Sequence, residues 1–377
     1  MSINNISIKN FRILKEVDIK FCSDINIFYG LNGSGKTSIL ECLFFLSRGR
    51  SFKQSISNKL ISFGCQKFLI FSIIDKEIKI GISKSLNEKL LIKNDNRYIT
   101  SSFILSQSIT LQILSPDSYL LIESGPLIRR KFIDWYVFHV KHNLYKNWKR
   151  YKIILKQRNF ALKSKLSVNE VKAWDSEFIQ LTNEISNVRV DFINYLNIKL
   201  SKYQNNYLDN MELFIDYYPG WNQTNNYSKT LQDNYTKDHQ YGYTQFGLHK
   251  SDFKLKIKID GKSYLVKDVL SNGVKKYISM FLYILQIDMY LEMIDEDISK
   301  PVLLIDDITS EIDNKYSSLL IEFLSKLNIQ LFFTLLDNVD NVNLIKSLFN
   351  QFTNSEKIKL FHVKHGKINT EINYQDL

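Results

Sequence analysis

A short glycine-rich loop near the N-terminus constrains the fold of this chain more than any other segment. Its sequence is Gly30-Leu31-Asn32-Gly33-Ser34-Gly35-Lys36-Thr37. This sequence matches the phosphate-loop pattern of proteins that bind nucleoside triphosphates. Residues 25–29 form an apolar strand pattern before the loop, and residues 38–47 have a helical pattern after it. A phosphate loop joins a strand to a helix, so the context predicts an α/β nucleotide-binding core.

The loop residues have distinct expected roles at a bound nucleotide. Backbone N–H groups of the loop and the positive end of the following helix attract phosphate oxygens. Lys36 is expected to reach the β- and γ-phosphates, and the Thr37 hydroxyl to ligate Mg²⁺. We therefore expect ATP and Mg²⁺ as cofactors. The expected nucleotide contacts are Gly30, Leu31, Asn32, Gly33, Ser34, Gly35, Lys36, Thr37 and Ser38.

A second acidic element is expected behind a phosphate loop, and residues 302–307 supply it. The apolar strand Val302–Ile305 ends in Asp306 and Asp307. We expect Asp306 to hold Mg²⁺, partly through water, and Asp307 to polarise the attacking water. Lys36, Asp306 and Asp307 are thus the candidate catalytic residues.

Three other residue patterns leave two interpretations open. Ser271 and Gly273 lie in a Leu-Ser-Asn-Gly element at a predicted helix start, where the serine either contacts phosphate or is a plain N-cap. Gln112 is either a loop glutamine near the metal and the γ-phosphate or an ordinary strand residue. His249 is either a structural hydrogen-bonding group or a functional one.

The remaining pattern predicts an α/β architecture with a helical insertion. Strand-like segments within residues 66–120, including 109–114, suggest an antiparallel sheet beside the nucleotide core. Two long amphipathic helices joined near Ser167 predict a hairpin arm, and residues 203–240 read as an irregular connector. We therefore expect a discontinuous head, residues 1–135 and 241–377, and an arm over residues 136–240.

The charge distribution suggests a polyanionic partner. The net charge is +11, and nine Lys or Arg residues but no Asp or Glu lie between Lys141 and Lys165. A basic helix of this kind either contacts DNA phosphates or is a solvated face. The candidate DNA contacts are Lys146, Lys149, Arg150, Lys152 and Lys156.

Neither cysteines nor apolar runs suggest secretion or a membrane location. The three cysteines have no metal-ligand spacing and no even-numbered disulfide pattern. The N-terminus lacks a signal-peptide pattern, and no apolar run reaches the roughly 18 residues of a membrane span. We expect a cytoplasmic protein without a membrane partner.

The order of these motifs resembles the ABC-type ATPase heads of the SMC superfamily. Within it, the chain resembles the RecF family of bacterial recombination mediators. The resembling segments are residues 8–12, 32–41, 115–117, 125–135, 247–252 and 306–313. The segments containing Arg129-Arg130 and Gly247-Leu248-His249 are not general ATPase features.

The resemblance implies a compact head with a mixed-sheet core, an antiparallel β subdomain and a short inserted arm. It implies an ATP-dependent homodimer that encloses the nucleotide, with Ser271 and Gly273 acting from the second copy, Arg12 near the nucleotide, and Asp313 at the interface. It also implies weak DNA-dependent ATPase activity that acts as a switch. Family members bind DNA at single-strand gaps and duplex junctions and work with RecR and RecO to load RecA, in recombinational repair, replication restart and the SOS response.

Three departures from the wider pattern accompany the resemblance. Asp307 replaces the usual glutamate of ABC proteins, a change that suits slow hydrolysis and that RecF-like proteins share. Thr334 occupies the region where ABC proteins carry a switch histidine, and Leu248 replaces a family proline.

Two other classes of P-loop protein fit the sequence less well. A nuclease-associated ATPase head requires a further catalytic metal domain, for which the sequence shows no motif. A transporter's nucleotide-binding subunit places its acidic strand roughly 100–150 residues after the loop, whereas here the separation is about 270 residues.

Overall fold

The chain forms two compact units. The computed structural model describes residues 2–53, 57–75, 77–95, 97–99, 102–141, 144–222, 226–294, 300–307, 312–336 and 358–371. The first unit is Met1–Ser118 with Ile294–Leu377, and the second is Tyr119–Met293.

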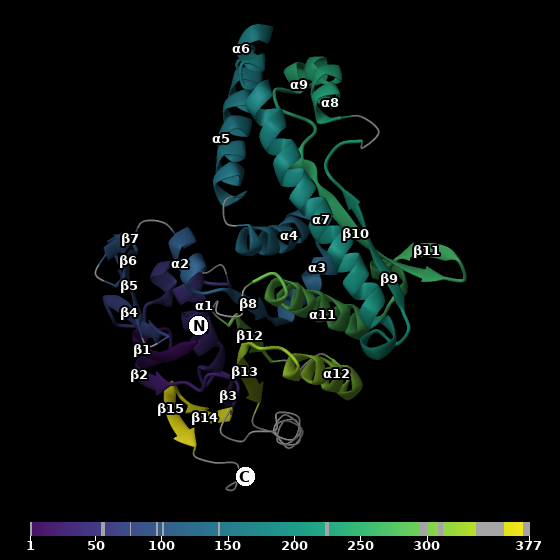
Figure 1. The fold of residues 1–377 in the computed structure, drawn as a ribbon. Coiled ribbons are helices and arrows are strands. Elements are labelled where there is room, and N and C mark those ends of the chain that lie inside the picture. The colour runs from purple at the N-terminus through teal and green to yellow at the C-terminus, as the bar shows by residue number, and fades with distance from the viewer. Residues whose placement is uncertain are drawn as a thin grey trace. The chain divides into compact units, whose positions relative to one another are not determined.

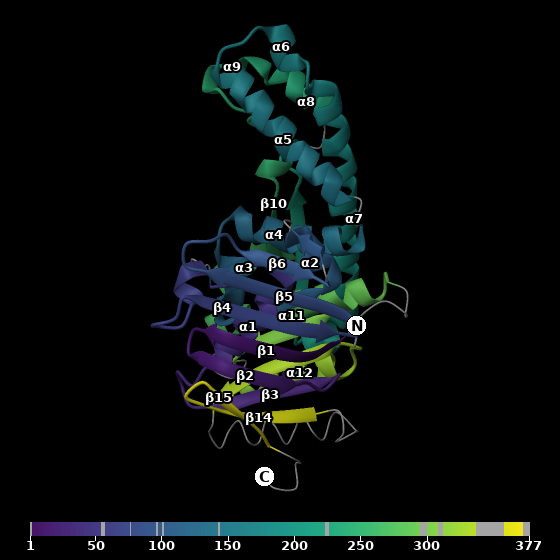
Figure 2. The same ribbon diagram turned by 90° about the vertical axis from the view of Figure 1, so that its left-hand side faces the viewer.

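An antiparallel sheet of six strands forms one part of the first unit, and Figure 2 shows several of its strands side by side. Its strand order is β2-β1-β4-β5-β6-β7. Every second side chain of β4 is buried, as the sequence alternation predicts. The strands are β1 (Ile3–Phe11), β2 (Leu14–Lys20), β4 (Lys67–Ile74), β5 (Ile78–Ser85), β6 (Leu91–Asn94) and β7 (Arg97–Ile99).

A mixed six-stranded sheet carries the phosphate loop. Its order is β15-β14-β3-β13-β12-β8, in which only the β14–β15 pair is antiparallel. Its strands are β3 (Ile25–Gly30), β8 (Leu111–Leu114), β12 (Val302–Asp306), β13 (Gln330–Leu336), β14 (Ile358–Lys364) and β15 (Lys367–Glu371). The expectation that residues 109–114 join the antiparallel sheet is wrong. Strand β8 pairs in parallel with β12, a long-range pairing that local alternation does not reveal.

The helix after the phosphate loop, α1 (Lys36–Arg48), packs against strands of both sheets. Its buried side chains join one hydrophobic core with those of β1, β4, β12 and β13. Because β3 and β12 run parallel in the same sheet, their carboxyl ends meet at one edge. This edge brings the phosphate loop and Asp306 together. The unit also contains α2 (Ser102–Ser108) and α12 (Asn314–Ser325).

The second unit contains the predicted helical hairpin. Helix α5 (Leu144–Lys163) packs along α7 (Asp175–Tyr207), and the short α6 (Val168–Lys172) lies at the tip where the hairpin turns (Figure 1). Ser167 begins α6 with a capping box that includes Glu170. The unit extends beyond the predicted arm of residues 136–240, because α4 (Pro126–Val140) and α11 (Asn272–Leu291) also pack on α7.

Residues 203–240 are not the irregular connector that the sequence predicts. Helix α7 continues to Tyr207, and β9 (Glu212–Tyr218) then pairs with β10 (Asp252–Ile259). This pairing with a distant strand has no local sequence signal. The other elements of the unit are β11 (Lys262–Leu265), α3 (Leu120–Glu123), α8 (Tyr227–Asp233), α9 (Tyr235–Tyr241) and α10 (Val266–Val269). Within the described chain, no helix has both the length and the apolarity that crossing a membrane requires.

Candidate functional site

A polar cavity of about 280 Å³ lies over the phosphate loop, at the carboxyl edge of the mixed sheet. Strand β3 ends at Gly30, and α1 begins at Lys36 with Gly35 as its N-cap. The first turn of α1 therefore presents its free N–H groups and the positive end of its dipole to the cavity. The lining residues are Ile13, Asn32, Gly33, Ser34, Gly35, Lys36, Thr37, Ser38, Lys53, Asp306, Asp307, Thr334 and Leu336.

The structure brings the two expected magnesium ligands into contact. The Thr37 hydroxyl donates a hydrogen bond to Oδ1 of Asp306 at 3.0 Å. The Thr334 hydroxyl donates to the same oxygen at 2.7 Å, and Asp306 is buried. A hydroxyl and a carboxylate beside a phosphate site are the oxygen ligands that Mg²⁺ takes in such proteins. The residues present therefore fit this metal.

Lys36 folds back over the loop. Its ammonium group donates hydrogen bonds of 2.8 Å to the carbonyl oxygens of Gly30 and Leu31. The hydroxyl of Ser34 is buried, and no described residue offers it a hydrogen-bond partner. Since buried polar atoms are nearly always satisfied, this hydroxyl marks the loop as a place for a polar ligand.

Thr334 connects both aspartates, although it is not among the site residues predicted from the sequence. Its hydroxyl accepts a 3.0 Å hydrogen bond from the backbone N–H of Asp307, which has a left-handed φ of 54°. Thr334 lies opposite Asp306 in the parallel β12–β13 register. The sequence signal for Thr334 was its place in the region where ABC proteins carry a switch histidine, and the register adds that residues paired at strand ends share a sheet edge. Lys53, a second cation in the cavity, was also missed.

Four predicted site residues of the first unit are not part of the cavity lining: Arg12, Gly30, Leu31 and Gln112. The Arg12 guanidinium binds the buried carboxylate of Glu41 on α1, with Nη2–Oε1 at 2.9 Å. Its neighbour Ile13 lines the cavity instead. Gln112 lies inside β8, in register with Leu303 of β12 and thus short of the strand end that carries Asp306. This placement favours the ordinary strand interpretation of Gln112.

Ser271 and Gly273 belong to the second unit. Ser271 is the N-cap residue of α11, but its exposed side chain makes no capping hydrogen bond. A Cβ atom added at Gly273 would meet nothing within 4 Å. The Ser271 hydroxyl therefore does not cap its helix, and the missing side chain of Gly273 is not required by packing within the chain. Asp313 is the N-cap residue of α12, whereas Ser310 and Glu311 lie outside the described residues.

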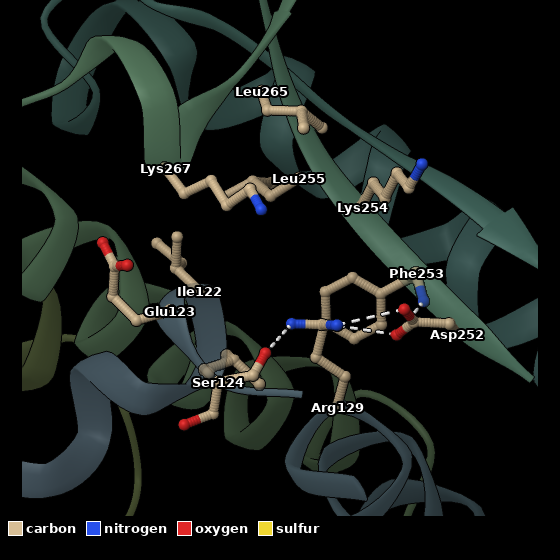
Figure 3. Close-up of a pocket in the computed structure, with 11 residues that line it drawn as sticks. Ile122, Glu123, Ser124, Arg129, Asp252, Phe253, Lys254, Leu255, Leu265 and Lys267 are labelled. Carbon is tan, nitrogen blue, oxygen red and sulfur yellow. Dashed lines mark hydrogen bonds and ion pairs between the residues drawn. The ribbon is translucent and has the colours of Figure 1, made fainter. Parts of the chain in front are cut away.

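The Arg129 and Asp252 side chains join two of the distinctive sequence segments beside a second cavity of about 230 Å³ (Figure 3). The Arg129 Nε and Nη2 atoms bind both oxygens of Asp252, at 2.7 and 3.0 Å, and Nη1 donates to the carbonyl of Ser124. Arg130 donates to the carbonyl of Ser251 at 2.7 Å. These arginines hold α4 against the start of β10, which is a structural role.

His249 is a structural hydrogen-bonding group. One ring nitrogen lies 3.0 Å from the Tyr151 hydroxyl and the other lies 2.9 Å from the Thr244 carbonyl oxygen. Burial lowers the pKa of His249 to about 4, so the ring is neutral at neutral pH. In this state, one nitrogen donates to the carbonyl while the other accepts from the hydroxyl.

The candidate DNA contacts all lie exposed on α5, but their surroundings differ. Arg150 forms a bidentate ion pair with Glu177, both N–O distances being 2.6 Å. The Lys152 ammonium lies 4.9 Å from the ring centre of Trp148. Arg158 of the same basic run is buried and bonded to Asp175 and Asp238, so it has a structural role. The remaining candidates, which form no ion pair among the described residues, are Lys146, Lys149 and Lys156.

Comparison with known proteins finds full-length similarity. Residues 2–359 match the family model of the RecF/RecN/SMC N terminal domain. The chain is 35% identical over 380 residues to the DNA replication and repair protein RecF of Psychromonas ingrahamii, covering 98% of this chain and all of that protein. It is 30% identical over 371 residues to the RecF protein of Shewanella frigidimarina, covering 98% and 99% of the two chains.

Solved structures give the same result. A structure of the recombination mediator protein RecF with ATP matches with a TM-score of 0.81 and 26% identity, covering 98% of both chains. The Smc head domain of Pyrococcus furiosus, at 14% identity and a TM-score of 0.60, shares the fold.

Proposed function

Because the chain belongs to the RecF family of DNA replication and repair proteins, within the RecF/RecN/SMC N terminal domain family, we propose that it is an ATP-switched DNA-binding protein. ATP binding would drive dimerisation on DNA, and slow hydrolysis would release the dimer. The observation that carries the nucleotide part is the contact of Thr37 and Thr334 with one oxygen of Asp306.

The phosphate loop supplies one half of the proposed site. Its amide groups and Lys36 would hold the phosphates, which requires the Lys36 ammonium to exchange its bonds to Gly30 and Leu31 for phosphate oxygens. Thr37 and Asp306 would hold Mg²⁺, which when bound neutralises charge on the β- and γ-phosphate oxygens. Asp307 would orient and polarise the attacking water. Its short side chain and constrained backbone suit a slow switch.

Ser271 and Gly273 would supply the other half from a second copy of the chain. The exposed serine hydroxyl, the open space at Gly273 and the N-terminus of the 20-residue helix α11 together suit an anionic phosphate. A homodimer would then contain two shared sites. Arg12, bound to Glu41 beside Ile13, would act near the nucleotide through the position of that turn.

The basic face of α5 would contact DNA phosphates. Lys149, Lys152 and Lys156 are exposed and follow one another at spacings of three and four residues, so they share one side of the helix. Phosphate contacts fix position and carry little sequence information. We therefore propose binding to gaps and single-strand/duplex junctions by shape and charge.

The proposed partners and pathway are inferred from membership of the RecF family. We propose that the protein acts in the cytoplasm with RecO and RecR to load RecA, in recombinational repair, replication restart and the SOS response. The support is the full-length similarity to RecF proteins, one of which is described in the RecFOR pathway.

The test is an assay of dimerisation and gapped-DNA binding with and without ATP and Mg²⁺. Wild type is compared with Lys36→Met, Asp306→Asn and Ser271→Arg. We expect ATP to promote both properties in the wild type, Lys36→Met to lose nucleotide binding, and Ser271→Arg to bind ATP as a monomer.

The outcomes separate the parts of the proposal. If ATP changes neither the oligomeric state nor the DNA affinity of the wild type, the protein is not an ATP-controlled switch. ATP-driven dimers of Ser271→Arg would remove the role of Ser271 in the second copy and leave the phosphate loop untouched.

A further inference from the structure

A hairpin distant in sequence packs on the phosphate loop. Strand β14 pairs in parallel with β3, so that His362 lies opposite Tyr29 and their rings stack at 5.0 Å. One residue further, the carbonyl oxygen of Val363 lies where a side chain of Gly30 would be, 2.3 Å from the position of a Cβ atom. The first residue of the phosphate loop is thus in close contact with the β14 backbone.

The tip of the same hairpin contacts the middle of the loop. His365 and Gly366 form a two-residue turn between β14 and β15, with φ values of 47° and 76°. The backbone N–H of Gly366 donates a 2.8 Å hydrogen bond to the carbonyl oxygen of Ser34. This bond fixes the peptide unit that precedes Gly35 and the start of α1.

Ile13 fills the space between the turn and the loop. A Cβ atom at Gly366 would lie 2.4 Å from the Ile13 carbonyl oxygen, and one at Gly35 would lie 3.1 Å from Cγ2 of Ile13. Three backbone segments therefore pack without room for a further carbon atom. The N–H groups that face the cavity belong to the loop held in this way.

We propose that the His365-Gly366 turn positions the phosphate loop, with Gly366 as a positioning residue that fixes the loop for the nucleotide's phosphates. This inference rests on the proposed binding of ATP. Gly366 meets the cavity lining at Ser34, Gly35 and Ile13, so its effect on nucleotide would pass through them.

The chain contains a matched control turn. Asp260 and Gly261 join β10 and β11 with φ values of 50° and 75°, nearly the same backbone as His365 and Gly366. A Cβ atom at Gly261 would meet nothing within 4 Å. Gly261→Ala therefore imposes the same left-handed backbone strain as Gly366→Ala without displacing a neighbour.

The experiment measures binding of a fluorescent ATP analogue to the full chain, below the melting temperature of each variant. Because small misplacements of binding groups are costly, we expect Gly366→Ala to weaken affinity by about tenfold to a hundredfold. We expect Gly261→Ala to stay within about twofold of wild type. Hydrogen exchange of the peptide containing residues 30–37, without nucleotide, is expected to rise in Gly366→Ala alone.

Other outcomes would overturn the positioning role. Gly366→Ala with wild-type affinity and wild-type exchange in residues 30–37 would do so. If Gly366→Ala does not fold, Gly366→Asn adds the same Cβ atom with less backbone strain and is read in the same way. Exchange of the wild-type Gly366 amide as fast as that of Gly261 would also contradict the contact with Ser34. A wild type that binds no analogue would instead remove the nucleotide proposal itself.

Discussion

The Thr37 hydroxyl and Asp306 Oδ1 are hydrogen-bonded at 3.0 Å, although 269 residues separate them in the chain. The same oxygen accepts a bond of 2.7 Å from Thr334. Two hydroxyl donors thus hold one carboxylate at the start of α1. In the proposed nucleotide site, groups held in this way would need little reorganisation on binding, which is the condition for efficient electrostatic stabilisation.

Replacing Thr334 is expected to slow hydrolysis more than it weakens ATP binding. Thr334→Val keeps the side-chain shape but removes both the donor to Asp306 and the hydroxyl that accepts from the N–H of Asp307. If these hydrogen bonds stabilise the transition state by about 1–2 kcal/mol, their loss lowers the rate of phosphate release roughly tenfold. Thr334→Ser, which keeps the hydroxyl, is the control. Equal rates for the valine variant and wild type would show that Thr334 does not order the aspartates.

Lysines on α5 are expected to differ from Arg150 in their effect on DNA binding. Lys149 is exposed without an ion pair among the described residues, whereas Arg150 is paired with Glu177. In anisotropy titrations on gapped duplex between about 50 and 200 mM salt, Lys149→Ala is expected to reduce the log–log salt slope by about 0.9. Arg150→Ala is expected to reduce it less. A slope unchanged by the triple variant Lys146→Ala, Lys149→Ala, Lys156→Ala would exclude this face.

Arg189 is expected to be a large contributor to the stability of the second unit. Its fully buried guanidinium binds Asp134 at 2.6 Å and the Ser251 hydroxyl at 2.9 Å. Arg189→Met leaves Asp134 without its cation, at an expected cost of about 3–5 kcal/mol in the free energy of unfolding. Arg150→Met, which breaks a solvent-exposed pair on the same hairpin, is expected to cost much less. Urea unfolding measures the free energy of unfolding of both variants. Similar losses for the two would contradict the large contribution of Arg189.

The buried histidine is expected to make stability depend on pH. The pKa of His249 is lowered by burial to about 4, and the unfolded chain therefore takes up this proton at higher pH than the folded chain. The resulting stability is fully present above about pH 6.5 and is lost as the pH falls toward 4. Between pH 7.5 and 5 we expect a loss of about 2 kcal/mol.

The control for this prediction is His249→Gln, which cannot take up a proton. Urea unfolding of both proteins at each pH separates the histidine from the common background of carboxylates. Parallel pH profiles of the two proteins would show that His249 does not carry this effect.

Local sequence patterns predicted the elements that local interactions specify. The strand, loop and helix around Lys36 and the helical hairpin around Ser167 are confirmed, because each depends on periodicity and turn chemistry within a short segment. The pair Thr37 and Asp306 was also predictable, since the ends of parallel strands share an edge.

Features that depend on the pairing of distant segments could not be predicted from the sequence. Thr334 enters the site only through its register with Asp306, and β9 forms only against β10. Likewise, nothing in the basic run distinguishes Lys149 from Arg150 until Glu177 of α7 is placed beside the latter. Local propensity carries no information on such partners.

The order of strands in the mixed sheet has a consequence for how the protein is made. Ile25 of β3 pairs with both Leu331 of β13 and Ile358 of β14. The second unit, Tyr119–Met293, is one continuous segment and can fold while the ribosome is still extending the chain. Of the strands in the mixed sheet, β3 is synthesised first, but its neighbours β13 and β14 are synthesised much later. Until they pair with it, the edges of β3 need protection from other chains. The proposed nucleotide site is therefore completed only after translation has passed β14.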